Sequence, residues 1–247
     1  MFAYCENNGI IRYDTTGEWF YSIENYNERF IKPIEETLNR LRNNSSKNRQ
    51  SYEIYKGYKS YYNTVISKRK RIESRYIENK KILGYYSNYI FGQDNYPVRK
   101  MKYGDSESEI RKVGCELIAI YNTMKYIGVY QSFARVILLA ELNGYPWLKG
   151  IFGTDPKIIG SYFSAYNVHY TRCRNMKSFK KEIKNSKFSI LSINNSDGIT
   201  IHTFCIRYVK SKNRYYSYNF YSDDNSPKLF NFSKIANRKF IVGYCFK

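Results

Sequence analysis

Cys115 is the residue with the clearest capacity for chemistry. It follows a glycine in the segment VGCELIAIYNTM and stands at the head of an apolar run with helical spacing, so we expect it to open a helix. The positive end of a helix favours a thiolate over a thiol, which makes Cys115 a candidate nucleophile. Its backbone N–H, at the same helix start, is a candidate donor to the oxyanion of a tetrahedral intermediate.

His202 and Asn219 are the residues that could assist this nucleophile. They lie in the alternating segments ITIHTFCIRYV and YYSYNFY, which predict two neighbouring strands over 199–209 and 215–221. We expect His202 to form an ion pair with the thiolate and then to protonate the leaving amine, while Asn219 orients the imidazole. The three side chains together are the components of thiol nucleophilic catalysis.

The turn between these two strands decides whether His202 and Asn219 meet. A two-residue loop at 211–212, or a four-residue loop at 210–213, places Phe204 opposite Asn219. His202 and Asn219 are then diagonal neighbours on one face of the sheet. A loop with an odd number of residues would put them on opposite faces.

The other cysteines and the second histidine indicate structural roles. Five cysteines are an odd number at scattered spacings, which suits reduced thiols better than a disulfide framework. Because the chain has no CxxC pair and only two histidines, we expect no structural zinc site and no cofactor. We interpret His169 as structural, and we expect three cysteines to fill the core from strands: Cys173, Cys205 and Cys245.

Size and charge bound the kind of protein that carries these residues. The 247 residues allow one large domain, or one domain with an extension. Aromatic residues make up 18% of the chain, with 28 tyrosines, so the core can be built from rings with one polar edge. The net charge of +20 favours an acidic partner or surface.

The sequence predicts a cytoplasmic protein. The opening MFAYCENNGIIRYD lacks the basic lead, apolar stretch and small-residue cleavage site of a secretory signal. We also find no window that approaches the roughly 18 apolar residues of a membrane span.

The composition changes near residue 100, which divides the chain into residues 1–100 and 101–247. After two short segments with strand character, IIRYD and EWFYSI, apolar residues at helical spacing predict helices over 27–43 and 49–83. The polar turn NNSSKN between them predicts a helical hairpin. We therefore expect residues 1–100 to form a mainly helical, basic extension.

One stretch of this extension, residues 40–81, carries a local charge excess equal to half of the net charge. The stretch 40–81 contains 13 basic residues and 3 acidic ones, and KRKR stands at 68–71. Lysines, arginines and tyrosines in alternation can follow a phosphate backbone and stack on bases, so an acidic partner or nucleic acid is a candidate here. A solvated helical face is the simpler interpretation of the same pattern.

Residues 101–247 have the pattern of an α+β domain. Helices are expected first, and antiparallel strands follow, separated by polar turns with glycine or asparagine. The expected helices are 115–126, 132–142, 156–166 and 178–183, and the expected strands are 188–193, 199–209, 215–221 and 239–246.

The stretch 104–244 resembles the papain-like bacterial cysteine peptidases related to the double-glycine leader peptidases of bacteriocin exporters. The resemblance rests on GCELIAIYN, GTDPKIIGSYFSAYNVHY, the strand with IHTFCI, and YYSYNFY, in that order. It implies a papain-like fold and a peptidase that cleaves a peptide or protein substrate, with Cys115, His202 and Asn219 as active residues.

Two positions depart from that family. A glutamine shortly before the cysteine commonly supplies a second oxyanion donor there, whereas this chain has Glu109, whose ionised form cannot donate a hydrogen bond. Where the family often has Gly-Pro after the cysteine, this chain has Glu116 and Leu117.

Two other functions fit the same residues. The trio could transfer an acyl group, as in transglutaminase-like enzymes and acyltransferases, with Asp223 or Asp224 as its third member. Alternatively, the domain is a catalytically inactive papain-like scaffold whose basic hairpin binds nucleic acid, anionic lipid or an acidic protein.

Overall fold

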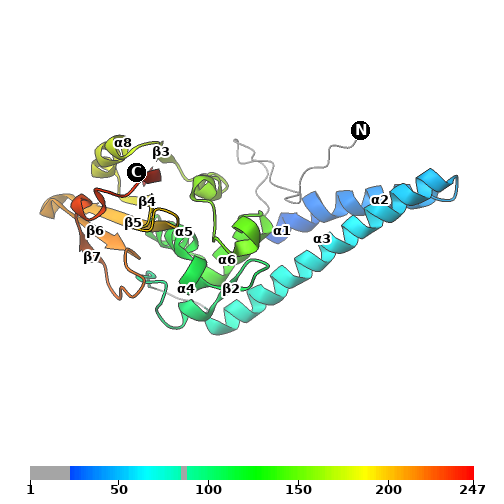
Figure 1. Cartoon of the computed structure of the whole chain (residues 1–247), viewed down its shortest axis with the longest axis horizontal. Coiled ribbons are helices and arrows are strands. Elements are labelled where there is room, and N and C mark those ends of the chain that lie inside the picture. Colours follow the sequence, from blue (N-terminus) through cyan, green and yellow to red (C-terminus); the bar gives the residue numbers. More distant parts are fainter. Residues whose placement is uncertain (1–22, 85–87) are drawn as a thin grey trace.

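The computed structural model describes residues 23–84 and 88–247. It is an α+β structure in which helices cover an antiparallel sheet and a long helical hairpin extends to one side (Figure 1). The strand segments expected at IIRYD and EWFYSI fall on residues 1–22, outside the described residues, except for Ile23, which begins a helix.

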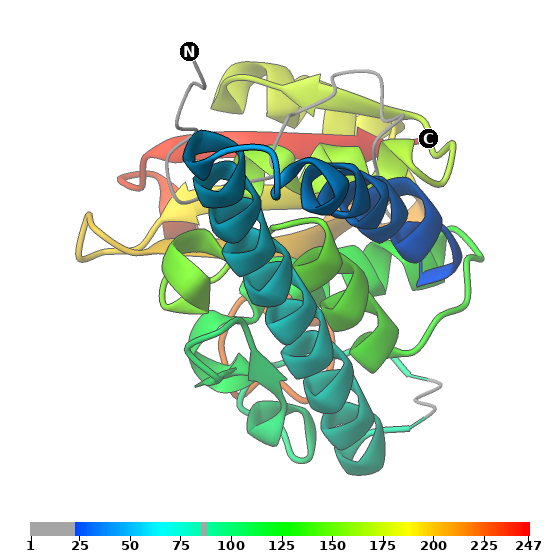
Figure 2. The same cartoon turned by 90° about the vertical axis from the view of Figure 1, so that its right-hand side faces the viewer.

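The helical hairpin is confirmed. It consists of α1 (Ile23–Tyr26), a π-helical turn (Asn27–Ile31), α2 (Lys32–Asn44) and α3 (Arg49–Ile82). Asn48 ends the polar turn and caps α3, because its Oδ1 accepts a hydrogen bond from the Ser51 N–H at 2.8 Å. Figure 2 shows α2 and α3 lying in front of the sheet and the other helices.

The hairpin shares its core with the rest of the chain. Ile72 of α3 and Phe30 belong to the same buried apolar cluster as Phe133 and Phe246. The change of composition near residue 100 therefore does not separate two hydrophobic cores.

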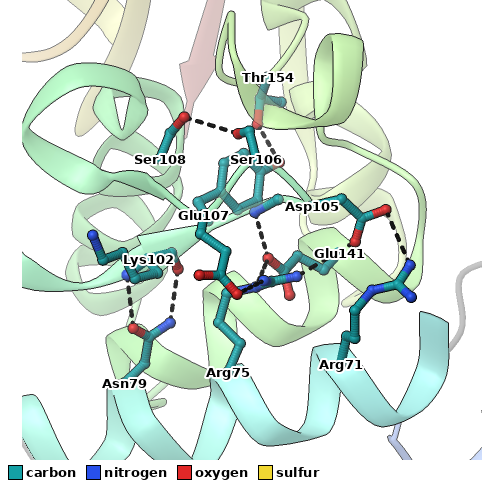
Figure 3. Close-up of polar contacts among 12 residues, drawn as sticks. Arg71, Arg75, Asn79, Lys102, Asp105, Ser106, Glu107, Ser108, Glu141 and Thr154 are labelled. Atoms are coloured by element: carbon teal, nitrogen blue, oxygen red, sulfur yellow. Dashed lines mark hydrogen bonds and ion pairs between the residues drawn. The ribbon is translucent and has the colours of Figure 1, made fainter. Parts of the chain in front are cut away.

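A buried ion pair joins α3 to residues 101–247 (Figure 3). Arg75 Nε lies 2.7 Å from Oε1 of Glu141, and the same oxygen accepts the Gly104 N–H at 2.6 Å. One turn further along α3, the Asn79 side chain bonds both the N–H and the C=O of Lys102, each at 2.8 Å. These contacts hold α3 against residues 101–247. Breaking the ion pair would be costly, because it would leave a buried charge uncompensated.

The expected helices of residues 101–247 are present, with ends that differ by a few residues. Ser132 and Asp155 cap their helices, accepting hydrogen bonds from Arg135 N and Lys157 N. The helices are α4 (Ile110–Val113), α5 (Cys115–Tyr126), α6 (Phe133–Leu142), a 3₁₀ turn (Pro156–Ile158) continued by α7 (Ile159–Ser164), and α8 (Met176–Glu182) continued by a 3₁₀ turn (Ile183–Asn185).

Within the described residues, the main sheet has six strands in the order β3-β8-β4-β5-β6-β7, with antiparallel neighbours. A separate two-stranded ribbon pairs β1 (Lys102–Tyr103) with β2 (Ser108–Glu109). The six strands are β3 (Tyr170–Cys173), β4 (Phe188–Asn194), β5 (Ile201–Val209), β6 (Arg214–Tyr218), β7 (Lys228–Phe230) and β8 (Phe240–Phe246).

The register of the β5–β6 hairpin is the one expected. Val209 pairs with Arg214, so the loop is the four-residue 210–213, and Cys205 pairs with Tyr218. The observed strand is shorter than the expected strand 215–221, since β6 ends at Tyr218. Asn219 takes a left-handed backbone conformation, with φ of 61°, which turns the chain out of the strand.

The two faces of the sheet are covered by different elements. On one face, β5 packs against α5, and the Cys205 Sγ donates to the main-chain oxygen of Ala119 at 3.5 Å. On the other face, Phe204 belongs to a second buried cluster that includes Phe179 of α8 and Phe230 of β7. Because successive side chains of a strand point to opposite faces, each residue of β5 contributes to one of these two environments.

Candidate functional site

Cys115 is the first residue of α5, as predicted, and its side chain is buried. Its Sγ donates a hydrogen bond to Oε2 of Glu116 at 3.2 Å, and the backbone N–H of Thr203 on β5 also acts on the thiol. The preceding Gly114 is required by close packing, because a Cβ there would collide with Ile110. The cysteine is therefore enclosed between the start of α5 and the middle of β5.

Glu116 is a buried carboxyl that the sequence analysis noted only as a departure from the family. Its Oε1 accepts a hydrogen bond from Oγ1 of Thr203 at 3.1 Å, and the backbone N–H of Thr154 also acts on it. Gly153, at φ of 71°, lies so close that a Cβ would be 3.2 Å from Oε2. Burial raises the pKa of Glu116 to about 7, and these hydrogen bonds partly oppose the rise.

The thiol form of Cys115 is favoured over the thiolate. Burial raises the pKa of Cys115 well above its usual value, and the negative charge of Glu116 raises it further. The Thr203 N–H acts in the opposite direction, as does the helix start. The expectation of an environment that lowers the thiol pKa is therefore wrong for this arrangement.

His202 lies next to Asn219, but the contact is to the main chain. Its Nε2 is 2.7 Å from the backbone oxygen of Asn219, so this nitrogen carries the proton. The ring stacks on Phe204 with centroids 5.7 Å apart. Burial lowers the pKa of His202 to about 4, and the charge of Arg238 lowers it too, whereas the Asn219 oxygen opposes the shift.

The structure does not bring Cys115 and His202 together. Thr203 points its hydroxyl to Glu116 on the α5 side of β5, whereas His202, its neighbour in the strand, lies with Phe204 on the other side. Within the described residues, no hydrogen bond joins the thiol to the imidazole. The predicted thiolate–imidazolium pair is absent because strand alternation places the two groups on opposite faces of β5.

Asn219 does not use its side chain to orient the imidazole. Its Oδ1 accepts the backbone N–H of Gln93 at 2.9 Å, and its own N–H bonds the main-chain oxygen of Phe91 at 2.7 Å. Its Nδ2 is buried and has no hydrogen-bond partner in the described part of the chain. The side chain therefore holds the segment 91–93 against the end of β6, and only the main-chain oxygen reaches His202.

The secondary candidates lie in unrelated surroundings. Glu109 is a partly exposed carboxylate that accepts from Nε of Arg111 at 2.6 Å, a bond that lowers its pKa, so it stays ionised and cannot donate to an oxyanion. Asp223 is exposed, and Asp224 is buried and accepts the Tyr221 N–H at 3.0 Å. His169 precedes β3 and lines a surface hollow with Arg172.

The sequence assigned no role at the site to Glu116 and Thr203, which contact the thiol, or to Thr154, whose backbone N–H acts on Glu116. One signal could have found Thr203: a hydroxyl between Phe204 and His202 marks the opposite face of a strand whose other positions are largely apolar. Thr154 Oγ1 continues the polar contacts to Tyr103, whose hydroxyl lies 2.7 Å away. Within the described residues, no group of three metal-ligating side chains is assembled.

The sequence matches no protein-family model in a scan of such models. A search of curated proteins likewise finds no match.

Proposed function

We propose that this protein binds an extended anionic partner through the α2–α3 hairpin. The observation that carries the proposal is exposure: of the 13 basic residues between Arg40 and Lys81, all except Arg69 and Arg75 are exposed. The hairpin extends away from the sheet (Figure 1), so these charges are accessible to a large partner. A phosphate backbone or an anionic surface is the partner that such a stripe attracts.

The two buried exceptions have structural partners. Arg69 pairs with Glu73 at 2.7 Å and lies 4.9 Å from the ring centre of Tyr26, and Arg75 pairs with Glu141. Among the exposed basic residues of the stretch 40–81, Arg71 alone lies within 4.0 Å of a carboxylate in the described residues. The remaining charges are therefore not neutralised within the described part of the chain.

Aromatic rings lie between these charges. Tyr52 and Tyr61 are 51% and 41% exposed on α3, and Lys59 lies 5.9 Å from the ring centre of Tyr55. Rings and cations in alternation can contact both the charged and the flat parts of an anionic partner. This pattern supports binding by the hairpin itself, beyond the attraction due to net charge.

Binding assays with three anionic probes test the proposal: a labelled DNA duplex, heparin and phosphatidylglycerol vesicles. We expect at least one to bind, with an affinity that falls by more than about tenfold between low and moderate salt. The double variant Lys56→Glu and Lys59→Glu should weaken binding by about tenfold or more. Its matched control, Lys212→Glu with Lys239→Glu, changes the net charge equally at exposed sites outside the hairpin.

Three results would contradict hairpin binding. They are no binding of any probe, binding that ignores salt, and an equal loss in the two double variants. The last result would assign the attraction to net charge alone.

A second candidate is a cysteine peptidase that uses Cys115, His202 and Asn219. The order of its segments resembles that of papain-like peptidases, and the Thr203 N–H at the thiol belongs to the residue next to His202. For catalysis, the imidazole must leave the Asn219 oxygen and turn toward the α5 side of β5. The oxyanion would then be met by the Cys115 N–H at the start of α5.

Labelling with an iodoacetamide or epoxide probe tests this candidate. Cys115→Ala should abolish labelling, while the matched core variant Cys173→Ala should retain it. His202→Ala should slow labelling of Cys115 by at least about tenfold if the imidazole activates the thiol. Equal labelling of the parent and Cys115→Ala would reject the nucleophile, and amine incorporation in place of hydrolysis would favour acyl transfer.

A further inference from the structure

The segment 147–152 exposes an unusual group of large apolar side chains. Trp147 is 47% exposed, and Leu148, Ile151 and Phe152 are each 58% exposed. The Trp147 and Phe152 rings lie beside each other, with centroids 6.1 Å apart. Four such side chains exposed within six residues are an apolar group of the kind that marks an interaction site.

The backbone holds this segment in an exposed turn. Leu148 and Lys149 have φ of 45° and 62°, a left-handed conformation that is uncommon for residues with a Cβ, and above all for leucine. The surrounding contacts impose it: the Lys149 oxygen accepts the Ser106 N–H at 2.9 Å, and Gly104 packs so tightly there that a Cβ would collide with that oxygen. Backbone strain retained around exposed apolar side chains is typical of functional loops.

Basic residues lie near the apolar turn, together with the acidic Asp105 and Glu107. Lys149 is exposed within it, and Arg71 of α3 reaches Asp105, the residue before Ser106 (Figure 3). Lys68 lies one helical turn before Arg71 and is exposed as well. A surface that meets the turn therefore also meets positive charges at the base of the hairpin.

We infer that the segment 147–152 docks on an anionic lipid bilayer, with its apolar side chains inserted at the interface and the nearby lysines and arginine facing lipid phosphates. This inference rests on the proposed anionic partner of the hairpin and names it as a lipid surface. Aliphatic side chains such as Leu148 and Ile151 cannot stack on bases or bind phosphates, so a nucleic acid leaves them exposed. A bilayer buries them while its headgroups meet the charges. None of the helices in the described residues is long and apolar enough to cross a membrane.

Vesicle co-sedimentation of the full chain tests the inference. The probes are phosphatidylcholine vesicles with and without phosphatidylglycerol, and the DNA duplex serves as the competing partner. The test variant is Leu148→Ser, Ile151→Ser and Phe152→Ser together. The matched control changes three large exposed side chains outside the hairpin and the loop: Tyr130→Ser, Ile199→Ser and Leu229→Ser. Thermal unfolding of each variant checks that it is folded.

We expect the anionic vesicles to bind the parent and the control alike, and the loop variant to bind at least tenfold more weakly. In a Trp19→Phe background, where Trp147 is the remaining tryptophan, its emission should shift to the blue on vesicle binding. The inference is overturned if the loop variant binds vesicles as the parent does, if the emission does not shift, or if only the duplex binds. In each of these cases the hairpin proposal stands, whereas binding to none of the anionic probes would reject the hairpin proposal too.

Discussion

The two faces of β5 differ in what their polar groups do. On the α5 face, Thr203 and Glu116 share a hydrogen bond, and the Glu116 carboxyl tends to keep its proton. On the opposite face, His202 packs on Phe204 and tends to lose its proton. Burial favours the neutral forms of both groups. The strand lies between the Glu116 carboxyl and the His202 imidazole, whereas a catalytic acid–base pair would need to be brought together.

The largest effect on stability is expected from the apolar cluster on the His202 face of β5. Phe204 is fully buried against Phe220 and Phe230, with ring centres 4.9 and 5.5 Å away. Phe204→Ala should lower the free energy of unfolding by about 3–5 kcal/mol, since it leaves a cavity in the second cluster. Urea unfolding measures this loss. The control Leu229→Ala, at an exposed site, should change little, and a similar loss in both variants would contradict the packing of that face.

The α5 face should lose stability as the pH rises. The pKa of Glu116 is about 7 in the folded chain, above its ordinary value of 4.5, so the folded chain holds this proton more tightly than the unfolded chain. The contribution is complete below the unfolded pKa and is lost as pH rises through about 7, by about 3 kcal/mol in all. Urea unfolding at several pH values should show that Glu116→Gln removes this decline. A decline of unchanged slope in the variant would place the titrating group elsewhere, for example at Glu141, whose pKa burial also raises to about 7.

The opposite face should respond to pH with the opposite sign. The pKa of His202 falls from 6.5 to about 4, so the unfolded chain binds the proton more tightly than the folded chain. Its contribution to stability is complete above about pH 6.5 and is lost as pH falls through about 4, again by about 3 kcal/mol. The variant His202→Asn should lack this pH dependence. The difference in the free energy of unfolding between parent and variant should therefore change as the pH falls below about 6.5. The comparison fails if His202→Asn and Glu116→Gln change the pH profile in the same direction.

The smallest effect is expected from the hydroxyl that links β5 to α5. Thr203→Val keeps the shape of the side chain but removes the donor to Glu116, so it should destabilise the fold by about 1–2 kcal/mol. The control is Thr171→Val on β3, at a partly exposed position. Thermal unfolding compares the two. Equal stability of both variants and the parent would mean that the Thr203 hydroxyl does not support the buried carboxyl.

Local patterns predicted the elements of this fold well. Helix 115–126 was expected at the residues where α5 begins and ends, and the even loop at 210–213 gave the observed pairing of Cys205 with Tyr218. These features depend on short-range spacing, on caps and on turn length, all of which are present in the sequence.

The arrangement of the site depends on long-range packing, which local patterns in the sequence do not specify. Alternation predicts that His202 and Thr203 face opposite sides of β5, but it does not say which side α5 will cover. Both sides carry apolar residues, among them Cys205 on one and Phe204 on the other, so the pattern is nearly symmetric. The left-handed turn at Asn219 was equally hidden, because it depends on the distant segment 91–93 that bonds it.

The length of α3 decides whether a charge bound at one end of the hairpin can act electrostatically at the other end. Its 34 residues span about 50 Å, whereas charges in physiological salt are screened over about 8 Å. A charge bound at the far turn is therefore screened by salt before the other end of α3. A sideways force on the far turn would instead be transmitted along α3 to the ion pair between Arg75 and Glu141.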